Sequence, residues 1–431
     1  MKLKYTFIIS VTLLVLIIVY YLSFPLGGKL NNRKSVKIYY IDNISVAHQH
    51  IIDLFNKEYS GKIEVVPIDI PFYKFSTNER KELLMRALRS ESERIDVFAA
   101  DIIWLKRFAK WAEPIDKYFP PKEKSKLTSK ALSTSTLNEK LYAVPIYLDI
   151  SVMFYRDDLL RKFHDYKKLE KKIVGSLTWH DFIQLGKKSN LKERFYVYPA
   201  DEYEGLICSF AELIIDQNYD FFANKFRFSD KISVKSAKLL SDLVNKYKIS
   251  PKNIINYREK NAYEDFITND ALFLRGWQSF KKDTKNLNKS KTKNKFIKEA
   301  RLPHFKGSKI GATIGGWNLM LAKNSKHKKE AIKFMKFILK EKSQKILYEQ
   351  GSYLPVIKSL YADSMFITKH PDLVFDGKLL EEGVLRPRLK LYTRISDILS
   401  HYLRLAIAGK ISPEQAMKNT DTDLIKLKDK D

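Results

Sequence analysis

The sequence predicts an α/β protein in which helices cover both faces of a mostly parallel sheet. Strand-like and helix-like patterns alternate between residues 36 and 111 in the order β-α-β-α-β-α, and such alternation is typical of parallel sheets. The chain of 431 residues is 45% hydrophobic and 30% charged, which is the composition of a folded protein with two or three domains. A single long apolar run, at residues 5–24, excludes a multi-span membrane protein.

That apolar run is predicted to be a membrane anchor. Residues 5–24 carry no formal charge, and twenty helical residues are long enough to cross a hydrocarbon core of about 30 Å. A small-residue cleavage site is absent, and Cys208 is the only cysteine, so a lipid-modified cysteine cannot anchor the chain. We expect an uncleaved transmembrane helix at 5–24 and a tether at 25–35, with a cleaved signal peptide as the alternative.

The first three strand and helix pairs are read from short patterns. Residues 36–41 and 63–70 predict strands, and each is followed by apolar residues at helical spacing, over 46–59 and around 83–88. A third buried strand at 95–99 leads into Asp101, which is placed to cap the helix that carries Trp104. Ligands of parallel sheets bind beyond the carboxyl ends of strands, so Asp101 and Trp104 are candidate site residues.

The rest of the chain is predicted to be mainly helical. Strand-like pieces occur at 142–150, 151–155, 271–274 and 311–322, and the lysine-rich stretch 281–298 is predicted to be a solvated loop. Helical spacing occurs in eight further stretches: 157–164, 178–188, 203–217, 234–247, 328–340, 341–349, 391–408 and 413–426.

The sequence offers little support for an enzyme. It lacks a phosphate-binding G-x-x-x-x-G-K-[ST], an H-E-x-x-H and a G-x-S-x-G motif. The histidines are scattered and Cys208 is alone, so we expect no cofactor and no metal. Asp101 and Asp149 are the carboxylate pair that would serve glycoside hydrolysis. The net charge of +28 suits an acidic polymer, an anionic membrane surface or merely a lysine-rich proteome.

Several separated blocks resemble one family. From residue 36 onward the chain resembles the family 1 extracellular solute-binding proteins, the carbohydrate receptors of ABC importers. Each block is weak alone, but they follow one another in the family's order: 96–104, 113–119, 140–149, 152–160, 177–182, 274–277, 315–317, 322–331, 353–356, and 386–387 ahead of 408–416.

The resemblance implies a two-lobed, type II periplasmic-binding-protein fold. It implies three hinge crossovers, near Pro145, Thr313 and Ala362, so that each lobe is built from two parts of the chain. The first lobe would comprise 36–145 and 314–362, and the second 146–313 and 363–431. We expect a monomer that does not bind nucleic acid.

The resemblance also assigns roles to residues at the matched positions. A sugar site needs aromatic faces and strong hydrogen-bonding groups. Trp277 and Trp317 would stack on pyranose rings, Asp101 and Asp149 would accept from hydroxyl groups, and Tyr147 would do either. The remaining expected ligand-binding residues are Trp104, Gly316 for close backbone approach, Arg386 as a donor, and Asp42 and Asn43 in place of a glutamate that relatives often have.

Structural alternatives exist for seven of these residues. The three tryptophans are also compatible with an ordinary core, and Asp101 with a helix cap alone. Tyr147 and Asp149 are compatible with a hinge role, and Arg386 with a surface charge.

The predicted function is capture of a carbohydrate outside the cytoplasm and its delivery to an ABC permease. The receptor would be held at the cytoplasmic membrane by a single N-terminal anchor, with its lobes outside the cytoplasm. One alternative is a sensor subunit read by a membrane histidine kinase. The other is an extracellular glycan-active enzyme that uses Asp101 and Asp149; the leading prediction is not an enzyme.

Overall fold

The computed structural model describes residues 35–428, except 73, 76, 91–94, 224–225, 281–292 and 388–390. The anchor expected at 5–24 and the tether expected at 25–35, apart from Ser35, lie outside the described residues. Among the helices that the structure does describe, none combines the length and apolar character needed to cross a membrane.

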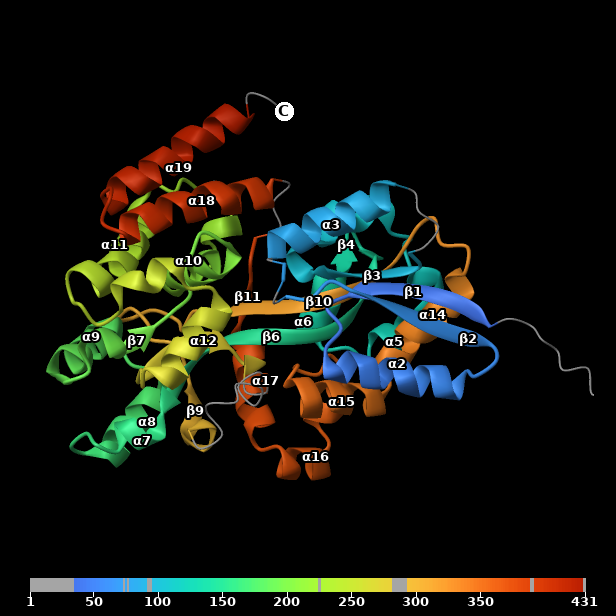
Figure 1. The fold of residues 1–431 in the computed structure, drawn as a ribbon, viewed down its shortest axis with the longest axis horizontal. Helices are drawn as coiled ribbons and strands as arrows, with labels where there is room; N and C mark the ends of the chain where they lie inside the picture. The colour runs from blue at the N-terminus through green and yellow to red at the C-terminus, as the bar shows by residue number, and fades with distance from the viewer. Residues whose placement is uncertain are drawn as a thin grey trace, which may run out of the picture.

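The described chain forms two α/β lobes joined along a continuous sheet (Figure 1). The sheet contains nine strands, and its main path is β2 (Ile63–Asp69), β1 (Val36–Asp42), β3 (Val97–Asp101), β10 (Thr313–Leu321), β6 (Ala143–Arg156), β8 (Phe273–Trp277) and β7 (Tyr196–Val197). Two further strands lie off this main path: β11 (Val384–Leu385) pairs with β10, and β9 (Ile297–Ala300) pairs with β6. A separate hairpin joins β4 (Thr136–Leu137) to β5 (Lys140–Leu141).

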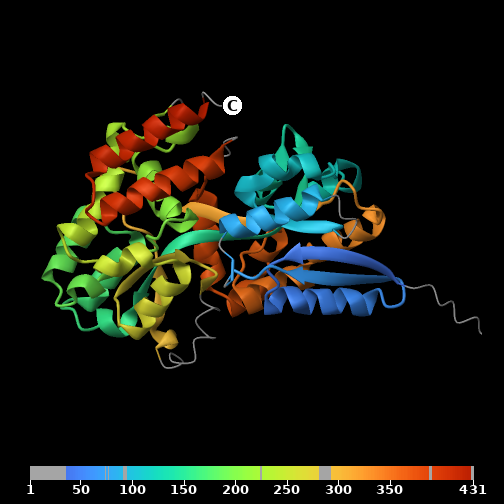
Figure 2. The ribbon, with the colours of Figure 1, turned by 45° about the horizontal axis from the view of Figure 1, so that its top comes forward.

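The predicted alternation is confirmed in the first lobe. Strands β1, β2 and β3 are parallel, and both views show α3 and α2 on opposite sides of them (Figures 1 and 2). Its core is built on residues such as Ile38, Phe55, Val97 and Leu319. The helices around this lobe are α2 (Val46–Glu58), α3 (Thr77–Arg89), α4 (Leu105–Phe108), α5 (Pro121–Lys124), α6 (Ser129–Ser135), α14 (Lys328–Ile338) and α15 (Glu341–Gly351).

The second lobe has its own core, which includes Phe182, Phe210, Leu243 and Leu403. A third cluster, with Leu148, Phe154 and Ile314, lies along the strands that join the lobes. Two helices lie beside that junction, α16 (Ser364–Lys369) and α17 (Asp372–Glu382). The helices of the second lobe are α7 (Asp157–Leu160), α8 (Tyr166–Gly175), α9 (Trp179–Lys188), α10 (Glu204–Gln217), α11 (Lys231–Asn245), α12 (Glu259–Thr268), α18 (Tyr392–Ile407) and α19 (Pro413–Lys428).

Two differences from the sequence prediction have simple physical causes. The strands expected at 142–150 and 151–155 are one strand, β6, which is buried along its whole length and is continuous because both of its halves have pairing partners. Its first half pairs with β10 and its second half with β8 and β9, so β6 passes from one lobe into the other. Six helices were not predicted: α5, α6, α8, α12, α16 and α17. Of these, α8 carries a lysine run, and α17 contains Gly377, which lowers helix propensity.

Candidate functional site

Strand register gathers expected site residues from four distant stretches of the chain. Trp317 on β10 lies opposite Asp101 of β3 on one side and Tyr147 of β6 on the other. Gly315 lies opposite Asp149, and Trp277 on β8 lies opposite Ser151, two residues further along β6. These candidates therefore occupy neighbouring positions on β3, β10, β6 and β8, where the two lobes join.

Trp317 forms one wall of a pocket in the first lobe. Its side chain is only 7% exposed, and its ring meets Phe72 and Trp104 edge-on, with centroids 5.3 and 6.1 Å away. The guanidinium of Arg80 lies over the same ring, 4.2 Å from its centroid. The pocket is lined by Ile41, Asp42, Ile70, Arg80, Leu84, Ala99, Trp104 and Trp317.

Asp42 and Asn43 bind two residues that surround Trp317 in this pocket, Arg80 and Phe72. Asp42 is 4% exposed and accepts hydrogen bonds from Arg80 Nη2 at 3.2 Å, from the Tyr40 hydroxyl at 2.5 Å and from its neighbour's backbone N–H at 2.6 Å. The Asn43 amide oxygen accepts from the backbone N–H of Phe72 at 3.1 Å. Burial lowers the pKa of Arg80, and the charge of Asp42 opposes that shift. In this conformation the two residues hold Arg80 and Phe72 in place.

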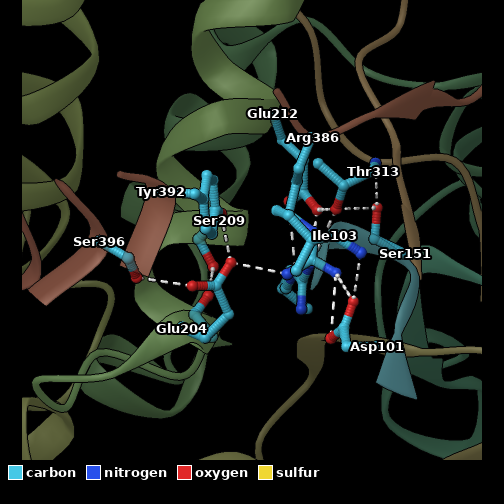
Figure 3. Close-up of polar contacts among 12 residues, drawn as sticks. Asp101, Ile103, Ser151, Glu204, Ser209, Glu212, Thr313, Arg386, Tyr392 and Ser396 are labelled. Atoms are coloured by element: carbon cyan, nitrogen blue, oxygen red, sulfur yellow. Dashed lines mark hydrogen bonds and ion pairs between the residues drawn. The ribbon is translucent and has the colours of Figure 1, made fainter. Parts of the chain in front are cut away.

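In the second lobe, Trp277 is paired with an arginine in the same way as Trp317 is in the first. It is partly exposed, and the Arg275 guanidinium lies 4.6 Å from the centroid of its ring. The ring rests on Gly315, where an added Cβ would come within 3.0 Å of it. Glu212 holds Arg275 in place, because its two carboxylate oxygens accept from Arg275 Nε and Nη2. Glu212 also accepts from Thr313 Oγ1 at 2.6 Å (Figure 3).

Gly316 allows β10 and β6 to approach closely. Its φ is +141°, and an added Cβ would lie 2.6 Å from the carbonyl oxygen of Tyr147. A side chain at this position is therefore excluded by the backbone of β6. The Tyr147 ring itself is 6% exposed and stacks on Tyr353, with centroids 4.0 Å apart.

Arg386 connects the two lobes. Its Nη2 donates to Asp101 of β3 at 3.1 Å, and its Nη1 donates to Glu204 of α10 at 2.6 Å. Glu204 also accepts from the hydroxyl groups of Tyr392 and Ser396, so it ties the start of α18 to α10. Figure 3 shows the two carboxylates on different sides of Arg386.

Asp101 also caps the turn that follows β3, as predicted. Its Oδ1 accepts from the backbone N–H of Ile103 at 3.0 Å. The same carboxylate therefore fixes Trp104, which belongs to this turn and is 4% exposed, and binds Arg386. The arrangement links the pocket wall to the contact between the lobes.

Asp149 is bound within the structure by the loop after β8. It is 8% exposed and accepts from the Ser279 hydroxyl at 2.6 Å and from the backbone N–H groups of Ser279 and Ile150. Burial raises its pKa to about 7, although these hydrogen bonds oppose the shift. Near neutral pH this carboxyl group is thus able to donate as well as accept.

The structure offers no metal site among its described residues, since no group of three or more His, Cys, Asp or Glu side chains there is placed to hold an ion. Cys208 is buried, and burial raises the pKa of its thiol to about 12, as suits a structural thiol.

Four charged residues of the site were missed by the sequence prediction: Arg80, Glu204, Glu212 and Arg275. Arg80 precedes Leu84 by four residues, so it lies on the buried face of α3. Glu204 and Glu212 share one face of α10 with Cys208 between them, and that helix is buried almost throughout. A charged residue on an apolar helix face is the signal that was available, because such a group needs a partner.

The family model of the bacterial extracellular solute-binding proteins matches residues 42–345. A probable ABC transporter-binding protein of Deinococcus radiodurans is 28% identical over 363 residues, which cover 82% of this chain and 84% of that protein. The galactooligosaccharide-binding protein of Bacillus subtilis is 24% identical over 303 residues, which cover 67% of this chain and 66% of that protein.

Solved structures show the same fold. The maltose-bound MalE3 protein of T. maritima superposes with a TM-score of 0.79 at 25% identity, over 91% of this chain and 100% of that chain. The GacH receptor of Streptomyces glaucescens, solved unliganded and with acarbose, superposes with a TM-score of 0.74 at 19% identity over 91% of this chain and 98% of that chain.

Proposed function

Because the chain belongs to the bacterial extracellular solute-binding proteins, we propose that it captures a carbohydrate between its two lobes and delivers it to an ABC import permease. The observation that supports this most is the register of β3, β10, β6 and β8, which gathers Asp101, Tyr147, Asp149, Trp277 and Trp317 at the junction of the lobes. The similar protein of Bacillus subtilis is named for galactooligosaccharide, and the similar MalE3 protein of T. maritima was solved with maltose bound.

The proposed contacts divide between aromatic rings and polar groups. Trp277 is the expected site tryptophan with an exposed surface, and its free area would cover the C–H face of a pyranose ring. Asp149 lies opposite Gly315, which carries the Trp277 ring, and would exchange hydrogen bonds with hydroxyl groups. We propose that the protein binds the sugar and does not cleave it.

Closure of the lobes would be coupled to the ligand through Arg386. Its guanidinium already contacts Asp101 in one lobe and Glu204 in the other, and its Nε has no partner among the described residues. A hydroxyl group that reached Nε would make one further contact only when the lobes are together, so it would favour the closed state. The hinge segments in this proposal are the three crossovers near Pro145, Thr313 and Ala362.

We further propose that residues 5–24 anchor the receptor to the cytoplasmic membrane and that 25–35 tether its lobes on the outer side. The absence of charge over twenty residues supports this part. Lobe boundaries are proposed as expected from the sequence, at 36–145, 146–313, 314–362 and 363–431. Fractionation of cells and the intact mass of the recovered protein test the anchor; a soluble form that lacks residues 1–24 would refute it.

Titration calorimetry of the full chain in detergent, with maltose and with galacto-oligosaccharides, tests the proposed function. We expect saturable binding of at least one sugar, loss of tenfold or more in affinity for Trp277→Ala, and no change for Tyr219→Ala, which removes an exposed aromatic side chain. X-ray scattering of the same samples should show a smaller radius of gyration with the ligand. Failure of every sugar to bind would refute the proposal.

The alternatives predict different results in the same samples. A glycan-active enzyme would release smaller sugars and lose that activity in Asp101→Asn or Asp149→Asn. A sensor subunit would bind and close in the same way, but deletion of a neighbouring kinase gene, and not of permease genes, would abolish the cellular response to the sugar.

A further inference from the structure

A row of positive charges lies on the outer face of α14 in the first lobe. This helix carries Lys329, Lys333 and Lys336, all of which are exposed. Their spacing of four and then three residues places them on one face of the helix, while six residues on its other sides are buried in the core of the lobe. Glu330 is the one acidic residue of α14, so the exposed face is strongly basic.

These charges are not neutralised by the protein. Lys329 and Lys333 form no ion pair with any residue that the structure describes, and Lys336 lies over the ring of Phe119, 5.3 Å from its centroid. The nearby carboxylate of Glu113 is already bound by two other lysines. The row therefore keeps its charge for a partner outside the protein.

The row lies beside the point where the chain enters the first lobe. Lys340, which follows α14, pairs with Glu58 at the end of α2, with 2.8 Å between Nζ and Oε1. The turn after α2 carries the exposed Lys62, whose carbonyl oxygen accepts from the backbone N–H of Val36 at the start of β1. Figure 1 shows α14 near that end of the molecule, and α8 near the other end.

The proposed anchor would keep this end of the lobe close to the membrane. Only residues 25–34 separate the anchor from Ser35, and ten residues span at most about 35 Å when fully extended. The eleven residues of α14 span about 16 Å. A bilayer that contains anionic lipid attracts exposed lysines, and the attraction decays over about 8 Å at physiological ionic strength. A tether this short brings the row of lysines within reach of the headgroups.

We propose that the exposed face of α14, together with Lys62, docks on anionic lipid headgroups around the anchor. The contact would hold the first lobe at the membrane and leave the second lobe free to move when the lobes close. This inference rests on the anchor in the proposed function, and it adds a binding partner for a surface away from the expected sugar site. A lipid surface is favoured over a soluble anionic polymer, because the position of the tether selects this face, whereas a polymer would meet every basic face alike.

Helix α8 provides a matched control in the second lobe. Its lysines at 167, 168, 171 and 172 are exposed and form no ion pair with a described residue. Both views place α8 far from the start of β1 (Figures 1 and 2). Nonspecific attraction of a chain with a net charge of +28 would act on α8 as much as on α14. A contact set by the tether would act on α14 alone.

The first test uses the full chain in lipid nanodiscs, made either of phosphatidylcholine alone or with phosphatidylglycerol added. Acetylation by a water-soluble reagent, followed by mass spectrometry, measures the accessibility of each lysine. Lys329 and Lys333 should react about threefold more slowly in the anionic nanodiscs, and about 0.5 M salt should abolish this difference. Lys167 and Lys168 should react at the same rate in both kinds of nanodisc.

The second test compares two variants of equal net charge. One carries Lys62→Gln, Lys329→Gln, Lys333→Gln and Lys336→Gln, and the other carries Lys167→Gln, Lys168→Gln, Lys171→Gln and Lys172→Gln. Thermal melts establish that both are folded. Lys340, which both variants retain, is the reporter: its protection by anionic lipid should be lost in the first variant and kept in the second.

Each contrary result has a distinct meaning. Equal reactivity of Lys329 in the two kinds of nanodisc, or equal protection of α8, would overturn this inference and leave sugar capture intact. Protection by soluble poly(glycerol phosphate), but not by phosphatidylglycerol, would assign the face to a polymer and overturn the lipid contact. A chain that does not remain with the nanodiscs would refute the anchor and this inference with it. The calorimetric titrations test sugar capture separately from all three results.

Discussion

Two tryptophan–arginine pairs lie near Gly315 and Gly316 of β10. The two pairs differ in how far the tryptophan ring is enclosed by other side chains. Arg80 covers Trp317 in the first lobe, and Arg275 covers Trp277 at the start of the second. Each arginine is neutralised by one buried carboxylate, Asp42 or Glu212. Trp317 is enclosed by Phe72 and Trp104 and belongs to the first core, whereas Trp277 is partly exposed.

This difference shows that the same pairing of a tryptophan with an arginine can stabilise a lobe or position a ring for a ligand. A ring that is covered on one face and also enclosed at its edges contributes to the stability of its lobe. A ring that is packed over most of its surface but partly exposed, as Trp277 is, keeps some surface for a ligand while its orientation is fixed. The two halves of the site should therefore respond differently to equivalent substitutions.

The largest expected contrast is in folding stability. Trp317→Ala should lower the free energy of unfolding by about 3–5 kcal/mol, as for large-to-small changes in a core. Trp277→Ala should lower it by less than Trp317→Ala does, since part of Trp277 is still exposed to water in the folded protein. Urea unfolding of the ligand-free protein, followed by circular dichroism, measures both. Equal losses in the two variants would remove the distinction between the two pairs.

The adjacent glycines provide a second contrast. Gly316→Ala should cost about 1–3 kcal/mol or more of stability, because φ is +141° and the new Cβ would meet the Tyr147 carbonyl. Gly315→Ala should instead displace the Trp277 ring, whose nearest atom is 3.0 Å from the new Cβ, and should weaken sugar binding with a smaller loss of stability. Thermal melts and calorimetry of the two variants separate these effects. A Gly315→Ala protein with unaltered affinity would show that Trp277 does not contact the ligand.

Much of the fold was predictable because its patterns are local. The strand and helix alternation of the first lobe follows from apolar spacing over short stretches, such as 46–59, where α2 spans Val46–Glu58. The path of β6 through both lobes was not predictable, because nothing in its sequence distinguishes two short strands from one long strand. Pairing partners that lie far away in the chain, on β10 and β8, decide that question.

The polar contacts of the site were harder to predict than its aromatic residues. Trp277 and Trp317 stand beside glycines, which is a visible pattern, and Asp101 follows a strand. Arg80 and Glu204 each depend on a partner more than 30 residues away, Asp42 and Arg386. Spacing shows that such charges are buried, but it does not show which opposite charge meets them or that Arg386 joins the lobes.

The smallest expected contrast concerns pH and lies on the Trp277 side, where Asp149 binds Ser279. The pKa of Asp149 is raised from 3.8 to about 7 in the folded protein, so between these values the folded state holds a proton that the unfolded state has lost. Its contribution to stability therefore falls as pH rises through that window, by at most about 1.4 kcal/mol per pH unit. Asp149→Asn should lose this contribution, so its stability should depend less steeply on pH.

Urea unfolding at pH 4, 5, 6 and 7 measures the slope, and two variants serve as references. Asp53→Asn changes an exposed carboxylate and should keep the wild-type slope. Asp216→Asn should reduce the slope, because burial also raises the pKa of Asp216 to about 7. Asp216 lies in the second lobe, where its carboxylate accepts from the backbone N–H of Phe305. Sugar affinity should change with pH through Asp149 and not through Asp216, since Asp149 lies opposite Gly315, on which the Trp277 ring rests, whereas Asp216 binds the backbone of Phe305. An affinity that varies with pH equally in Asp149→Asn and in the wild type would place the titrating group elsewhere and leave Trp277 without its polar neighbour in the site.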